Sequence, residues 1–333
     1  MTHRFEVLLL LLFGACRPTA AHPPATIPVA PDLETRAQDN DDPIRVAITV
    51  DDLPAHGPVP PDVTRLSLHQ RMLDAFAVHQ APRVYGFVNA ARAADAPDHL
   101  AALHAWVDAG HPLGNHTFSH PRMQDLDLSA YLAEIDGNEP LLAELVHDPS
   151  VYRKFRYPFL IEGTSEATTL AVREHLRSRG YRVAEVTIDF FDWAFNPPYV
   201  RCLSLGDDEA VTRLRGLFLD HALRMLQWSD AAAKQMYGRA IPHVLLLHVG
   251  AFGAEMMAPL LTAYERSGVE WITLDEALAD PVYLDVPIEP GVTQGTLLDL
   301  MIEARGVAHP PRPIQPTAEL DAMCRSASSA PRD

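Results

Sequence analysis

The feature that most constrains this fold is a regular alternation of short apolar segments with longer amphipathic ones. The segment 46–50 carries almost no polar residue, which is typical of a strand buried on both faces. Strands separated by helices pair in parallel, and about seven such units predict an α/β fold, a (β/α) barrel and not an open sheet. Short strands are predicted at 46–50, 84–88, 182–188 and 243–247, near Phe155 and near Trp271. Helices are predicted at 62–79, 98–109, 129–146, 165–180, 207–236 and 254–267, with a short one at Asp275.

The composition divides the chain into one catalytic domain with extensions at both ends. Of its 333 residues, 47% are hydrophobic and 21% are charged, so a large core is expected and general disorder is excluded. Proline-rich, aperiodic sequence occurs on both sides of the alternating region. We expect a leader at 1–21, a Pro/Ala-rich linker at 22–43, a single catalytic domain at 44–284 and an irregular C-terminal extension at 285–333.

The first residues resemble a secretion signal. Arg4 precedes an apolar run at 7–15, which is too short to span a bilayer but suits the h-region of a signal peptide. The segment 13–16 resembles a bacterial lipobox, in which Cys16 would carry the lipid. Cleavage after Ala20 or Ala21, or a buried core segment, are the alternatives. Either kind of signal predicts an extracytoplasmic protein, periplasmic or in the cell envelope, with the membrane involved only through an N-terminal lipid anchor.

Charge and cysteine content limit the partners further. The formal net charge of −17 repels phosphate backbones, so we expect neither nucleic acid nor an anionic membrane surface as a partner. After processing at the N-terminus, Cys202 and Cys324 would remain. They could form a disulfide in an oxidising compartment or stay as two separate buried thiols.

Chemistry in a parallel barrel is expected at the carboxyl ends of the strands. Asp51 and Asp52 follow the apolar segment 46–50 directly, and two adjacent carboxylates are tolerated where a cation neutralises one of them. A solvated turn is the alternative. His116 and His120 are four residues apart, which on a helical turn places both imidazoles on one face. Together with Asp52 they supply the ligand set of an open catalytic zinc site.

Five short motifs in a fixed order resemble those of the polysaccharide deacetylase family, also called carbohydrate esterase family 4 or the NodB homology domain. The motifs are TVDD at 49–52, HTFSH at 116–120, RYPF at 156–159, DFFDW at 189–193 and LLH at 246–248. The resemblance covers about residues 44–280. It implies a distorted barrel and a hydrolase that uses one divalent metal ion, usually zinc, with cobalt and nickel as alternatives. The expected substrate is an acetylated polysaccharide: N-acetyl groups of an amino sugar polymer or, in some members, O-acetyl groups of xylan.

The resemblance also implies a role for each matching residue. Asp52, His116 and His120 correspond to the metal ligands, and Asp51 corresponds to the general base, paired with Arg156. His248 would protonate the leaving amine, and Asp192 would orient its ring, with Asp189 as a helper. The remaining positions concern the substrate: the backbone N–H of Phe159 as oxyanion donor, and Trp193 and Leu246 as walls of the acetyl pocket.

One departure and three further polar residues complete the prediction. Leu53 stands where the family usually has glycine, so the turn beside Asp52 is expected to differ. Asn115 is interpreted as a residue that shapes the histidine loop, and His111 and His243 as structural. The leading hypothesis is a metal-dependent deacetylase of an extracytoplasmic polysaccharide such as peptidoglycan or a chitin-like glycan. The alternatives are a related amidase acting on a small non-sugar amide, and a non-catalytic glycan-binding lipoprotein.

Overall fold

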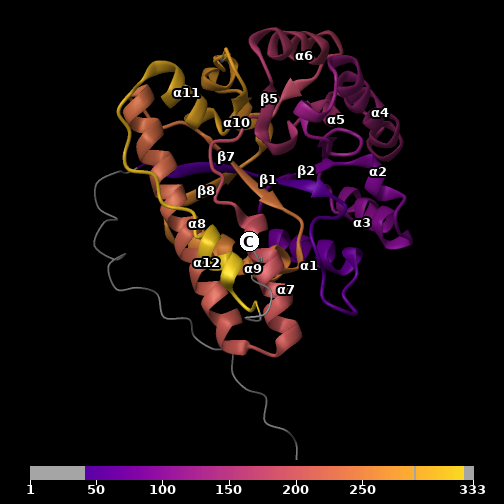
Figure 1. The fold of residues 1–333 in the computed structure, drawn as a ribbon, viewed down its shortest axis with the longest axis vertical. Coiled ribbons are helices and arrows are strands. Elements are labelled where there is room, and N and C mark those ends of the chain that lie inside the picture. Colours follow the sequence, from indigo (N-terminus) through magenta and orange to yellow (C-terminus); the bar gives the residue numbers. More distant parts are fainter. Residues whose placement is uncertain (1–41, 289, 326–333) are drawn as a thin grey trace, which may run out of the picture. The chain divides into compact units, whose positions relative to one another are not determined.

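Strand β1 (Ile44–Leu53) is the central element of the computed structural model, which describes residues 42–288 and 290–325 (Figure 1). It pairs in parallel with three strands: β2 (Tyr85–Val88), β7 (His243–His248) and β8 (Val269–Ile272). Residues 46–53 are all buried. A strand with neighbours on both edges and helices over its faces has no solvent-facing side, which explains the apolar sequence of this segment.

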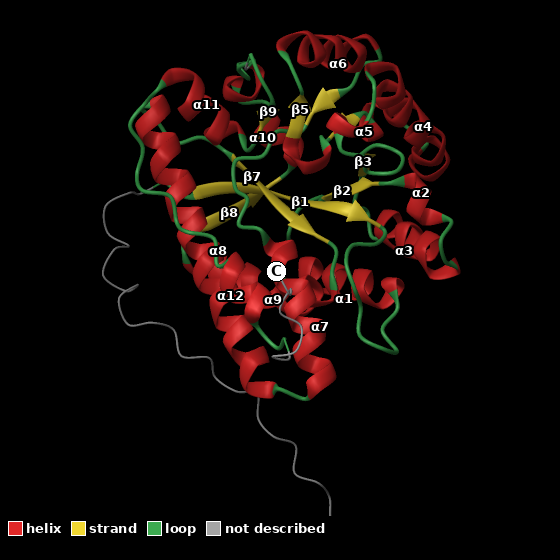
Figure 2. Cartoon of the chain, in the orientation of Figure 1, coloured by secondary structure: helices red, strands yellow, loops and turns green. Residues whose placement is uncertain are grey.

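The described strands form one seven-stranded parallel sheet and a small separate ribbon. The order in the large sheet is β6-β4-β3-β2-β1-β7, and β8 also pairs with β1. The remaining strands are β3 (Leu113–Asn115), β4 (Lys154–Phe155) and β6 (Arg182–Val183). An isolated parallel bridge between Ile188 and Leu245 brings the chain after β6 against β7. Figure 2 shows the strands at the centre with helices around them. The predicted α/β fold, a distorted (β/α) barrel, is confirmed.

The helices lie close to their predicted positions because their ends carry strong sequence signals. Side chains of Thr64, Asp127, Ser165, Asp207 and Thr273 each accept a hydrogen bond from a backbone N–H of the first helical turn. The helices between the strands are α1 (Arg65–Val78), α2 (Ala90–Ala93), α3 (Pro97–Asp108), α4 (Leu128–Val146), α5 (Pro149–Tyr152), α6 (Glu166–Ser178), α7 (Asn196–Leu205), α8 (Asp208–Tyr237), α9 (Ala251–Arg266) and α10 (Leu274–Leu278).

The strand predicted at 182–188 is shorter than expected. Only β6 is regular, and the chain then continues to the bridge at Ile188. The backbone groups in between have other partners: the C=O of Ala184 accepts from Arg156, and the C=O of Val186 accepts from the N–H of Leu297. Because these carbonyls bind groups outside the ladder, the regular pairing stops early.

The C-terminal extension is more regular than its prolines predict. It contains β9 (Thr293–Gln294), which pairs antiparallel with β5 (Ile161–Gly163), and the helices α11 (Leu297–Arg305) and α12 (Thr317–Ala322). Helix α11 forms because Thr296 and Asp299 make a capping box and because its Leu and Met side chains are buried. A disulfide joins Cys202 to Cys324. The sequence allowed either this disulfide or two free thiols.

Two predictions concern the ends of the chain. The leader with its lipid site at Cys16 and most of the linker fall in residues 1–41, outside the described residues. None of the helices within residues 42–288 and 290–325 has both the length and the apolar character that crossing a membrane requires.

Candidate metal centre and active site

The predicted site residues come together at the carboxyl ends of the parallel strands. Asp51 and Asp52 lie near the end of β1, His116 follows β3, Arg156 follows β4, and His248 ends β7. In the sheet order these strands follow one another with only β2 between β3 and β1, so their ends share one edge. Side chains separated by up to 197 positions in the sequence therefore meet.

Asp52, His116 and His120 form a cluster that fits a metal ion. Their potential ligand atoms all lie within 4.8 Å of one another. The Oδ1 atom of Asp52 is 3.2 Å from Nε2 of His120 and 3.7 Å from Nε2 of His116. That oxygen is buried and has no hydrogen-bond partner among the described residues. A buried carboxylate oxygen facing two imidazole nitrogens is the donor set that a divalent cation would satisfy.

The histidine loop achieves this without the helical turn that the spacing predicts, so that prediction is wrong. Residues 116–120 lie in an irregular segment after β3, where Thr117 and His120 have φ angles of 66° and 59°. Asn115 stabilises the segment as predicted, because its Oδ1 accepts from the N–H of Thr117 at 2.9 Å. The side-chain amide of Asn89 donates to the C=O of His116 at 2.6 Å. Side-chain amides thus replace the helical hydrogen bonds that the spacing suggested.

The hydrogen bonding of His116 leaves one ring nitrogen free for a metal. Its Nδ1 donates to the C=O of Arg156 at 2.8 Å, so Nε2 carries the lone pair that faces Asp52. Burial and the nearby ring of His120 hold the pKa of His116 well below its usual value. Burial also lowers the pKa of His120, although Asp52 opposes this. Both rings are therefore neutral, which is the form that binds a metal ion.

The two adjacent aspartates differ in protonation. Burial opposes ionisation of Asp52, but the hydrogen bond from His56 and the nearby ring of His120 outweigh it, and the pKa of Asp52 lies well below its usual value. Burial raises the pKa of Asp51 to about 6, and the guanidinium of Arg156 limits the rise. Asp52 is thus a permanent anion, whereas Asp51 can take up and release a proton near neutral pH.

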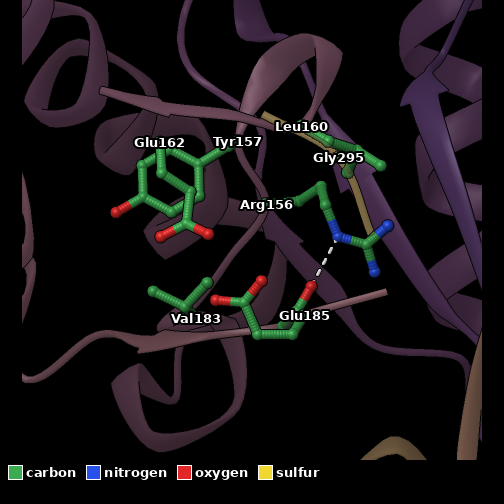
Figure 3. A pocket seen from close by; sticks show the side chains of 8 residues that line it. Arg156, Tyr157, Leu160, Glu162, Val183, Glu185 and Gly295 are labelled. Carbon is green, nitrogen blue, oxygen red and sulfur yellow. Dashed lines mark hydrogen bonds between the residues drawn. The ribbon is translucent and has the colours of Figure 1, made fainter. Parts of the chain in front are cut away.

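Arg156 is fully buried and is fixed from three sides. Its Nη1 lies 3.3 Å from Oδ2 of Asp51, and its Nη2 donates to the hydroxyl of Thr49 at 3.1 Å. Its Nε donates to the C=O of Ala184 at 2.7 Å, the bond that is dashed in Figure 3. The same figure shows a small cavity beside Arg156, about 10 Å³ in volume, into which Glu162 and Glu185 point. This cavity contains no predicted metal ligand.

His248 and Asp192 form a second buried pair in the site. The imidazole Nδ1 donates to Oδ1 of Asp192 at 2.7 Å, and the backbone N–H of His248 donates to Oδ2 at 2.8 Å. Burial disfavours the imidazolium, but Asp192 more than compensates and raises the pKa of His248 to about 9. The ring is therefore protonated at neutral pH, with Nε2 available to donate a proton. Asp189 accepts from the N–H of Phe191 at 2.8 Å and thereby holds the preceding turn.

The residues predicted to contact substrate lie at the site with different exposure. Phe159 is 37% exposed, and its ring centroid is 4.5 Å from that of His120. Trp193 is 40% exposed, and Leu246 is buried on β7, two residues before His248. Side chains two apart on a strand share a face, so Leu246 lies on the same face as the imidazole.

The turn beside Asp52 carries Leu53 at the position where the family usually has glycine. Asp52 itself adopts the left-handed conformation with φ 66°, the Leu53–Pro54 peptide is cis, and the N–H of Ala55 donates to the C=O of Asp52 at 2.9 Å. Leu53 is fully buried, and a side chain added at Gly86 would clash with it. Positive φ angles at non-glycine residues recur around the site, at Asp52, Thr117, His120, Phe159 and Phe191. Such conformations concentrate at functional sites, where the surrounding structure maintains them.

Sequence reasoning missed several residues of the site and correctly left out two others. Thr49, Asn89 and Asn138 position site groups through hydrogen bonds, and His56 contacts Asp52. The available signal for His56 was its position four residues after Asp52 on the same loop. The two histidines interpreted as structural have partners elsewhere: His111 accepts from the N–H of Val84, and His243 lies 3.2 Å from the hydroxyl of Thr187.

Several solved structures are similar to this chain. Solved structures with similar folds include a family 4 carbohydrate esterase from Streptomyces lividans in complex with acetate (19% identity, 70% of this chain and 95% of that chain, TM-score 0.44). Others are a mutant of the peptidoglycan deacetylase PdaC from Bacillus subtilis (17%, 72% and 94%, TM-score 0.45) and a pseudoenzyme of the same esterase family from Bacillus anthracis (16%, 72% and 66%, TM-score 0.48).

A sequence-family model and the five motifs relate the chain to one family. No curated protein matches the chain. Residues 38–184 match the model described as polysaccharide deacetylase, and this range includes the first three motifs. The last two motifs lie beyond it, and the structure brings Asp192 and His248 to the same strand ends. Residues 38–184 of this chain are thus similar to the polysaccharide deacetylase family.

Proposed function

We propose that this protein is a metal-dependent deacetylase that removes acetyl groups, chiefly N-acetyl, from an extracytoplasmic polysaccharide such as peptidoglycan or a chitin-like glycan. The observation that carries the proposal is the unpartnered Oδ1 of Asp52 between two neutral imidazoles, next to the base Asp51 and near the protonated His248. Metal-assisted amide hydrolysis requires a base, an acid and one bound cation that lie close together.

The proposed cation is zinc, held by Asp52, His116 and His120, with cobalt or nickel as substitutes. When bound, it would polarise the acetyl carbonyl and lower the pKa of water in the site. The rest of the chemistry belongs to the chain. Asp51 accepts a proton from the attacking water, and its buried position with a pKa of about 6 keeps it ionised and basic at neutral pH.

Arg156 and His248 complete the proposed proton path. Arg156 keeps the carboxylate of Asp51 oriented through the Nη1 contact at 3.3 Å. The protonated Nε2 of His248 donates to the leaving nitrogen as the carbon–nitrogen bond breaks, and Asp192 orients the ring by accepting from its Nδ1–H. One water and one amide thus give one acetate and one protonated amine. Asp51 takes a proton from the water, His248 gives its own proton to the leaving nitrogen, and proton exchange with solvent restores both side chains.

The substrate positions follow from exposure and placement. We propose the backbone N–H of Phe159 as a donor to the developing oxyanion. Trp193 and Leu246 would flank the acetyl methyl group, because an apolar wall admits a methyl group and excludes competing water. The exposed ring of Phe159 lies beside His120, so a sugar could pass over this edge of the site.

An extracytoplasmic location is part of the proposal. The disulfide between Cys202 and Cys324 supports it, because disulfides persist in oxidising compartments. The signal and the lipid attachment at Cys16 remain predictions from the sequence.

The test measures acetate released from N-acetyl chitooligosaccharide, from peptidoglycan and from acetylated xylan. We expect release from at least one of the first two, loss of release after chelation, and recovery on adding zinc. If the protein hydrolyses only small non-sugar amides and none of these polymers, the amidase alternative is correct and the polysaccharide deacetylase proposal is wrong. A pure protein that binds zinc and releases no acetate from any of these substrates would contradict the proposal.

A further inference from the structure

A fourth side chain, His56, contacts the candidate metal cluster. Its Nδ1 lies 2.5 Å from Oδ2 of Asp52, and its ring centroid is 5.2 Å from that of His248. His56 comes from the loop after β1 and belongs to none of the five family motifs. The side chain is 23% exposed, whereas that of Asp52 is 4% exposed. A histidine at the edge of the site thus reaches into it and touches one buried carboxylate.

The contact divides the two oxygens of Asp52 between different partners. Oδ2 meets His56, while Oδ1 faces Nε2 of His116 and of His120 and has no hydrogen-bond partner among the described residues. An ionised carboxylate can only accept, so Nδ1 of His56 must carry the proton. The hydrogen bond therefore occupies one oxygen and leaves the other for the cation.

The loop that carries His56 is anchored at four consecutive backbone carbonyls. The C=O of Ala55 accepts from Arg92, and those of His56 and Gly57 accept from the guanidinium of Arg65. The C=O of Pro58 accepts from the side-chain amide of Asn196 at 2.8 Å. These three donors come from α1, α2 and the start of α7. A loop held from three helices fixes the direction in which its side chains point, so the contact with Asp52 is built into the fold.

We infer that His56 is a positioning residue of the metal centre. Its Nδ1–H holds the carboxylate of Asp52 so that Oδ1 alone is presented toward His116 and His120. Hydrogen bonds of this kind orient metal ligands, and their loss typically weakens metal binding by about 10- to 100-fold. The inference rests on the proposed metal site and adds a residue that the family motifs do not contain.

The test compares the zinc dissociation constants of four purified proteins by competition with a chromogenic zinc chelator. They are the wild type, His56→Leu, His56→Asn and the control His175→Leu. Asparagine places an amide donor where the Nδ1 of histidine stood, because both atoms lie at the same number of bonds from the backbone. His175 is a matched control, because its Nε2 lies 2.8 Å from Oδ1 of Asp136 and its side chain is 20% exposed.

We expect His56→Leu to weaken zinc binding by about 10- to 100-fold and His56→Asn to recover most of the loss. The control should bind as the wild type does. Circular dichroism spectra of the metal-free proteins at the assay temperature should be the same for His56→Leu and the wild type, which shows that the variant is folded and that the change acts on the site.

The outcomes separate this inference from the proposed function. A wild type that binds no zinc contradicts the metal site itself. A wild type that binds zinc and a His56→Leu variant with the same affinity would overturn the role of His56 alone. An asparagine variant as weak as the leucine variant would overturn the hydrogen-bond role.

Discussion

Two pairs of buried carboxyl groups lie close to Arg156, and they differ in every other neighbour. Asp51 and Asp52 face the imidazoles of the candidate metal centre. Glu162 and Glu185 face the small cavity on which Arg156 also borders (Figure 3). The partner of the glutamate pair is Arg173, whose guanidinium lies 2.6 Å from Glu162.

The difference in neighbours shifts the pKa values of Asp52 and Glu185 in opposite directions. Asp52 has its pKa held well below the usual range by His56 and His120, against the effect of burial. Burial and the carboxylate of Glu162 raise the pKa of Glu185 well above its usual range. Burial also raises the pKa of Glu162, although Arg173 opposes it. Burial thus favours the protonated form of Glu185, whereas the imidazoles beside its unpartnered oxygen make Asp52 an anion suited to a cation.

The largest effect is expected from His116→Ala. Because His116 supplies one of three candidate ligands, its loss should weaken zinc binding by more than the roughly 10- to 100-fold typical of an outer residue. Acetate release should disappear at micromolar zinc. Zinc content after dialysis, with acetate release measured in parallel, checks this. A variant that retains one zinc per chain would show that the metal binds elsewhere. The aspartate pair would then not differ from the glutamate pair by belonging to a metal site.

Asp51→Asn tests whether Asp51 is the base and not a metal ligand like its neighbour Asp52. The variant removes the base and leaves all three candidate ligands, so kcat should fall by about 10²- to 10⁴-fold while zinc remains bound. Steady-state acetate release together with metal analysis measures both. If zinc is lost along with activity, Asp51 belongs to the ligand set, and the division of roles between the adjacent aspartates is wrong.

The pH dependence of kcat/KM tests the role of His248 as the general acid. Activity should fall above about pH 9, where His248 loses its proton, and on the acid side as Asp51 becomes protonated at or below about pH 6. Asp192 raises the pKa of His248, so Asp192→Asn should move the alkaline limb to lower pH. A profile from pH 5 to 10 for both proteins checks the shift. If the alkaline limb of Asp192→Asn is the same as that of the wild type, the limb reports the ionisation of a group other than His248.

The sequence predicts the fold and the site where local signals and strand order agree. The strand at 46–50 is predictable because its own residues are nearly all apolar. The helix near 129–146 is local in the same sense, because Asp127 caps its first turn. Asp52, His116 and His120 could be grouped because parallel strands end at one edge. The route of the loop 116–120 could not, because Asn89 and Asn138, from other elements, fix it.

Other features depend on packing that no local pattern records. His56 reaches Asp52 only because Arg65, Arg92 and Asn196 hold its loop. The glutamate pair combines a residue from β5 with one after β6, and nothing in either segment signals the other. Helix α11 was hidden by the surrounding prolines, although its capping box is local.

The smallest effect is expected in the glutamate pair, and it concerns stability. The folded pKa of Glu185 lies above its unfolded value of about 4.3, so between these two values the folded protein binds more protons than the unfolded chain. The free energy of unfolding therefore decreases as pH rises through this window, by up to about 1.4 kcal/mol per pH unit for one proton. Glu185→Gln cannot ionise and should lose this decrease.

The variant should match the wild type near pH 4.5 and exceed it in stability at pH 8, with acetate release nearly unchanged. Urea unfolding of the metal-free proteins at both pH values measures the difference, and Glu174→Gln, an exposed change on α6, is the control. Equal pH dependence in wild type and variant would mean that Glu185 ionises as it does in the unfolded chain. The second pair would then carry charge beside Arg156 and compete with Asp51 for it, and the contrast between the two pairs would lose its physical basis.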